Sequence, residues 1–116
     1  MKHICNTNMC SYQTLFYKEG LGYIVRCASC NNFQFAYNNI VVTVAAKDFI
    51  QLTIFLKKVL DRYGKTVREL AQPVAIPTPH NGVKLLLSGK EIEQVYGMFD
   101  HADTEWRCQQ LLELFD

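Results

Sequence analysis

Four of the five cysteines lie in the first 30 residues and form two closely spaced pairs. The pairs are Cys5-x4-Cys10 and Cys27-x2-Cys30, with sixteen residues between them. Cysteine thiolates are preferred zinc ligands, and a closed site of four thiolates is structural rather than catalytic. The second pair has the length of a zinc knuckle, and the longer gap of the first is still within the range of zinc sites. We therefore predict a structural zinc site formed by Cys5, Cys10, Cys27 and Cys30.

A β-hairpin is expected to bring the two pairs together. Residues 12–18 and 22–28 have the aromatic and β-branched character of strands, and the turn between them contains Gly20 and Gly22. If these strands pair around that turn, the numbers of facing residues add up to about 40, so Cys10 lies opposite Cys30. One end of the hairpin then gathers all four thiols, as in a zinc ribbon.

The cysteines also have other interpretations, which the sequence leaves open. They could form one or two disulfides or remain thiols without a metal, and His3 could replace Cys5 as a ligand. Redox activity is disfavoured because a thioredoxin-type pair begins a helix, whereas a β-rich aromatic segment follows Cys30. Cys108 has no neighbouring cysteine and lies on an apolar helical stripe, so we expect it in the core.

Composition predicts one intracellular domain. The chain has 116 residues, 49% of them hydrophobic, with 12 basic and 11 acidic side chains. A nearly balanced charge argues against a dedicated nucleic-acid binder. No segment has the ~18 consecutive apolar residues of a membrane span, and the N-terminus lacks the apolar region of a secretory signal. We expect a cytoplasmic protein that does not bind membranes.

The pattern of elements predicts an α+β fold over a single domain, residues 1–116. Residues 1–44 read as a cysteine-bearing antiparallel β-meander of four strands, the last at 40–44. Residues 45–64 hold a long helix that packs on this meander through one apolar stripe. Residues 65–116 read as an irregular segment, a short strand or hairpin ending at Leu87, and C-terminal helices.

The C-terminal region is predicted to hold two helices. Ser88 and Glu91 form a capping box that opens the first of them. Its apolar stripe extends to Trp106, but the apolar residues that follow fall on nearly the opposite side of a straight helix. These are Cys108, Leu111, Leu112 and Phe115. Asp103 or Thr104 could cap a new segment, so we predict a break there.

Three surface features bear on function. Phe33, Phe35 and Tyr37 share one face of a strand and form either a core row or a platform for stacking bases. Ile50 and Ile54 lie off the main stripe of the long helix, which suggests a protein partner or a homodimer. A basic cluster near the end of this helix could contact phosphates, although a solvated helix end explains it more simply. The cluster comprises Lys57, Lys58, Arg62, Lys65 and Arg68.

These features favour a non-enzymatic binding or adaptor protein with a structural zinc site. The alternative is a zinc-ribbon nucleic-acid-binding or regulatory protein. An enzyme ranks third because the histidines and acidic residues, such as His80, His101 and Asp48, form no recognisable catalytic set.

The chain also resembles a family of small uncharacterised bacterial proteins of Bacteroidetes type, classed as a domain of unknown function. The resemblance rests on Cys27–Cys30 leading into 32–40, on the helix from Lys47, on 83–88 and on the helix from Lys90. It implies an N-terminal hairpin bearing cysteine pairs and no established activity.

Overall fold

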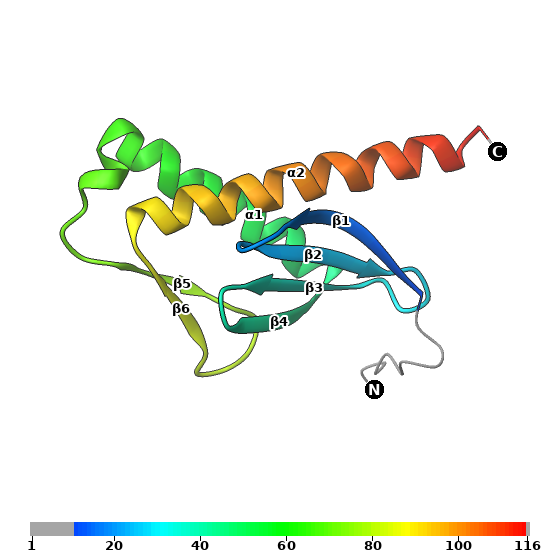
Figure 1. The fold of residues 1–116 in the computed structure, drawn as a ribbon, viewed down its shortest axis with the longest axis horizontal. Helices are drawn as coiled ribbons and strands as arrows, with labels where there is room; N and C mark the ends of the chain where they lie inside the picture. The colour runs from blue at the N-terminus through cyan, green and yellow to red at the C-terminus, as the bar shows by residue number, and fades with distance from the viewer. Residues whose placement is uncertain (1–10, 116) are drawn as a thin grey trace.

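The computed structural model describes residues 11–115, which form an α+β fold with two helices covering one face of a four-stranded antiparallel meander (Figure 1). The meander consists of β1 (Tyr12–Lys18), β2 (Gly22–Cys27), β3 (Asn32–Tyr37) and β4 (Ile40–Ala45). The chain continues through α1 (Ala46–Tyr63), the 3-10 helix η1 (Gly64–Glu69), β5 (Val74–Pro77), β6 (Lys84–Leu87) and α2 (Gly89–Glu113).

The predicted meander is confirmed, and its turns use residues that tolerate positive φ. Asn31 (φ 61°) and Asn38 (φ 55°) occupy the left-handed region at the β2–β3 and β3–β4 turns. Asparagine enters this region more readily than most residues other than glycine. The β1–β2 pairing contains a bulge between Thr14 and Phe16, so the register shifts by one residue towards the Cys27 end, where Tyr12 faces Cys27.

The core lies between the sheet and the two helices, and aromatic rings form its centre. Phe49 of α1 stacks on Phe33 of β3 at 4.3 Å and on Phe99 of α2 at 5.2 Å between ring centroids. Phe35 meets Phe99 edge to face. Phe33, Phe35 and Tyr37 are all buried. They therefore form a core row, and the alternative that they are a platform for stacking bases is wrong.

Helix α1 matches the predicted helix to within a residue at its start, and α2 begins as expected. Gly64 ends α1 with a positive φ of 56° and donates its N–H to the carbonyl of Leu60. Ser88 and Glu91 form the predicted capping box. Of the two alternatives expected before it, a short strand or a hairpin, the structure has the hairpin, because Val74–Pro77 pairs antiparallel with Lys84–Leu87.

The predicted break in the C-terminal region is wrong. Helix α2 runs without interruption from Gly89 to Glu113, and Trp106 is its last buried residue. Asp103 instead pairs with Arg107 one turn later within the same helix. Cys108 is exposed rather than in the core. The end of α2 therefore projects beyond the sheet (Figure 1) and exposes the apolar residues Leu111, Leu112, Leu114 and Phe115.

Candidate functional site

The Cys27–Cys30 segment forms a tight turn at one end of the β1–β2–β3 sheet. The N–H of Asn31 donates to the carbonyl oxygen of Cys27 at 2.8 Å, which closes the turn. The N–H of Ala28 donates to the carbonyl oxygen of Ser11 at 2.8 Å and ties the turn to the start of β1. Asn31 takes the left-handed conformation immediately after the second cysteine, so the chain can reverse directly into β3.

Backbone amides surround the sulfur atoms of this turn. Burial acts to raise the pKa of the Cys27 thiol, whereas hydrogen bonds from the N–H and thiol of Cys30 act to lower it. Together with the N–H groups of Ser29 and Ser11, they lower the pKa of Cys27 to about 7. Burial raises the pKa of the Cys30 thiol, and the neighbouring Cys27 sulfur adds to this, although the Asn32 N–H opposes it. The turn is therefore arranged to stabilise one anionic sulfur at Cys27.

Arg26 connects the turn to the rest of the fold. Its Nε donates to Oδ1 of Asn31 at 2.6 Å, and its Nη1 donates to Oε1 of Gln13 on β1 at 2.9 Å. Its guanidinium carbon lies 5.9 Å from the ring centroid of Trp106 on α2. Arg26 thus links the cysteine turn to both strand β1 and helix α2.

The structure brings together two of the four predicted zinc ligands, Cys27 and Cys30. Cys5 and Cys10 lie outside the described residues. Within residues 11–115, no group of three or more histidine, cysteine, aspartate or glutamate side chains is placed to hold a metal ion. The described part of the predicted site is therefore one pair of thiols. Ser11, the residue after Cys10, donates its N–H to the Cys27 sulfur, and its carbonyl oxygen accepts from the N–H of Ala28.

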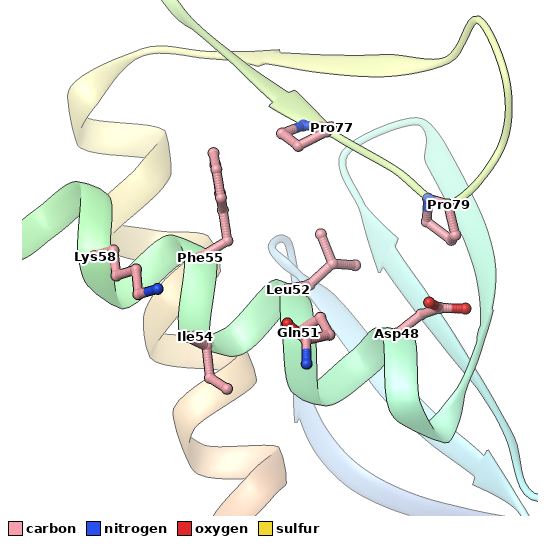
Figure 2. A pocket seen from close by; sticks show the side chains of 8 residues that line it. All are labelled: Asp48, Gln51, Leu52, Ile54, Phe55, Lys58, Pro77 and Pro79. Atoms are coloured by element: carbon pink, nitrogen blue, oxygen red, sulfur yellow. The ribbon is translucent and has the colours of Figure 1, made fainter.

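A shallow groove of about 240 Å³ runs between α1 and β5 (Figure 2). Leu52 and Phe55 point from α1 towards the prolines on the opposite wall, Pro77 and Pro79. Asp48 and Lys58 lie at its two ends. This groove was not predicted from the sequence, because its second wall, β5, becomes a strand only by pairing with β6.

Beside the groove, the side of α1 that faces away from the core is exposed. Ile50 and Ile54 are 38% and 43% exposed, so the expected apolar surface is present. The predicted basic cluster is exposed as well, and two of its members also pair with acidic residues. Lys57 pairs with Asp61 at 3.5 Å, and Arg68 pairs with Glu93 of α2 at 2.5 Å.

The two histidines in the described part of the chain, His80 and His101, each contact a neighbouring element of the fold. His80 Nε2 lies 2.8 Å from the carbonyl oxygen of Thr43, and the His101 ring meets Phe16 edge to face. Neither contact includes an acidic partner of the kind that orients a catalytic imidazole. None of the helices described is long and apolar enough to cross a membrane.

Comparison with known proteins identifies a family. The chain belongs to the family of unknown function DUF6686, whose profile matches residues 9–116. The match includes Cys10, Cys27 and Cys30 but begins after Cys5. No curated protein and no solved structure matches the chain.

Proposed function

We propose that this protein is a small, non-enzymatic binding or adaptor module whose first hairpin is stabilised by a structural zinc ion. The observation that carries the proposal is the Cys27–Cys30 turn, in which backbone amides converge on two neighbouring sulfur atoms. A zinc-bound thiolate is anionic, so the amides that favour a charged sulfur also favour zinc ligation. The asparagine at φ 61° after the second cysteine supports the same interpretation.

Cys10 is the third proposed ligand, and Cys5 is the fourth. Ser11 donates its N–H to the Cys27 sulfur, and the nitrogen of that N–H is bonded directly to the carbonyl carbon of Cys10. Because Cys10 is the residue next to Ser11 in the sequence, it is the thiol along the chain that we propose as the third ligand. Cys5 then completes the four-sulfur set that structural zinc prefers.

The proposed zinc would have a structural role. Four thiolates fill the tetrahedral positions of zinc and leave none open for a substrate, which is why such sites are closed. The ion would link the segment before β1 to the β2–β3 turn and so fix one end of the sheet. We place the protein in the bacterial cytoplasm, where thiols stay reduced and can ligate metal.

The binding surface in this proposal is the outer face of α1, with Ile50, Ile54 and the adjoining groove. A nucleic-acid partner is the less favoured alternative. The basic side chains near the end of α1 support it, but the aromatic row of β3, formed by Phe33, Phe35 and Tyr37, is buried and cannot stack with bases. Phosphate contacts alone would give weak and sequence-independent binding.

Metal content tests the zinc proposal. Protein purified under reducing conditions is expected to contain about one zinc per chain, as a single tetrahedral site requires. Cys27→Ser should abolish the zinc, while the matched control Cys108→Ser, on the exposed end of α2, should retain it. Protein without zinc before any chelator treatment, or zinc that survives Cys27→Ser, would refute the proposal.

A further inference from the structure

We propose that the outer face of α1 binds a second copy of this chain, with the two α1 helices antiparallel and Ile54 at the centre of the contact. This inference rests on the proposed role as a binding protein and specifies its partner. When two α1 helices lie antiparallel, the basic and acidic ends of their exposed faces lie opposite each other. This charge complementarity identifies a second copy of the chain as the partner.

The face consists of one continuous exposed stripe. Successive residues turn by about 100° around a helix, so positions three, four and seven apart lie on the same side. The core side of α1 is marked by the buried Phe49 and Leu56. The stripe on the opposite side, exposed at every position, contains Lys47, Ile50, Ile54, Lys57, Lys58 and Asp61.

Charge determines the direction of the pairing. Lys47 lies seven residues before Ile54, and Asp61 lies seven residues after it. In an antiparallel pair centred on Ile54, Lys47 therefore lies level with Asp61 of the second copy, and the twofold axis repeats this pair. A parallel arrangement would place Lys47 beside Lys47 and Asp61 beside Asp61, which is repulsive.

The existing contact of Asp61 is compatible with this arrangement. Its Oδ2 lies 3.5 Å from Nζ of Lys57 in the preceding turn. A carboxylate has two oxygens and accepts several hydrogen bonds, so Asp61 can retain Lys57 while it accepts from Lys47 of the second copy. The result is a three-residue charge network at each end of the contact.

The centre of the contact is apolar and adjoins the groove. The isoleucines at position 54 meet on the twofold axis. Ile50, four residues before the centre, falls level with Lys58 of the second copy, four residues after it. The aliphatic part of a lysine side chain can cover an apolar neighbour while the ammonium group stays in water. Lys58 also lies at one end of the groove (Figure 2), so Ile50 of the second copy reaches the groove entrance.

The contact is small, which sets the expected affinity. An interface formed by one helical face from each copy lies at the lower end of the range for specific complexes, roughly 1,000 Å² in total. We therefore expect a monomer–dimer equilibrium with a dissociation constant in the micromolar range rather than an obligate dimer.

Sedimentation velocity over a concentration series provides the test. The unmodified chain should form dimers reversibly. Lys47→Glu should weaken the dimer roughly tenfold because two attractive pairs become repulsive, and Asp61→Lys should do the same. The double variant carrying both changes restores opposite charges and should dimerise like the unmodified chain. Ile54→Glu should be monomeric.

Leu111→Glu is the matched control because it places the same change on the other exposed apolar surface, the end of α2. It should leave the dimer intact. A chain that stays monomeric at all concentrations, a dimer lost on Leu111→Glu, or a double variant that is not rescued would each overturn the inference. The zinc content of the unmodified chain is measured in parallel, since a zinc-loaded monomer would contradict only the dimer and a zinc-free dimer only the metal site.

Discussion

Asn31 provides a sharp test of the cysteine turn, because its backbone conformation and its side chain can be probed separately. Asn31 has φ 61°, and its Oδ1 accepts from Arg26. Asn31→Ala loses this acceptor and keeps a Cβ in the left-handed region, where it costs about 1–2 kcal/mol. Asn31→Gly loses the same acceptor without that steric cost. The difference between the two variants therefore isolates the backbone contribution.

We expect Asn31→Ala to be less stable than Asn31→Gly by about 1–2 kcal/mol, a factor of about 5–30 in the folding equilibrium. The free energy of unfolding is measured by urea titration of the reduced protein, and zinc retention by competition with a chelator. Asn32→Ala, one residue further along in β3, is the matched control and should change little, because only the backbone N–H of Asn32 faces the Cys30 sulfur. Equal stability of the Ala and Gly variants would refute the proposed role of the turn conformation.

Three further predictions concern the core, the thiols and the pH dependence of stability. Phe49→Ala should lower the free energy of unfolding by about 3–5 kcal/mol, because it leaves a cavity in the buried stack of aromatic rings. The control Phe115→Ala, at an 85% exposed position, should change the free energy of unfolding little. Equal effects of the two variants would contradict the described packing. In the reduced native protein, iodoacetamide should modify the exposed Cys108 quickly and the buried Cys27 only after unfolding. Mass spectrometry of peptides measures the modification, and rapid labelling of Cys27 in the native protein would contradict its burial. Burial and the nearby Glu91 charge raise the pKa of Tyr37 above its ordinary value of 10.0. The neutral Tyr37 hydroxyl therefore contributes fully to the stability of the fold below pH 10.0, and this contribution is lost as the pH rises through the raised pKa. Tyr37→Phe should flatten this alkaline decline in urea titrations, and an unchanged decline would count against it.

Local patterns were sufficient to predict the elements that depend on neighbouring residues. The alternation of Phe33, Phe35 and Tyr37 located both β3 and its buried face, since each strand residue points opposite to the next. The capping box at Ser88 predicted the start of α2 correctly. Each of these signals acts within a few residues, so the sequence alone carries it.

The errors arose where distant contacts decide the structure. Asp103 can cap a new helix or pair with Arg107 within a continuing one, and the local sequence permits both. The last turns of α2 face away from the core, so the assumption that every apolar stripe is buried placed Cys108 wrongly. Similarly, β5 contains Pro77 and becomes a strand only because β6 pairs with it. Proline is accommodated there because a two-stranded sheet consists of edge strands.

The candidate site was predictable in part. The spacing of Cys27 and Cys30 indicated a metal-type turn. The contacts of Arg26 with Asn31 and Trp106 could not be predicted, because they join a strand, a turn and a helix that are distant in sequence. The ligands expected from Cys5 and Cys10 remain predictions.

X-ray absorption at the zinc edge, on reduced protein as purified, tests the zinc site most directly. We predict a first coordination shell of sulfur alone, with about four scatterers at roughly 2.3 Å, the distance of zinc–thiolate bonds. Cys5→Ser or Cys10→Ser should replace one sulfur with a lighter atom or release the metal. A shell of nitrogen and oxygen around bound zinc would contradict the four-cysteine site.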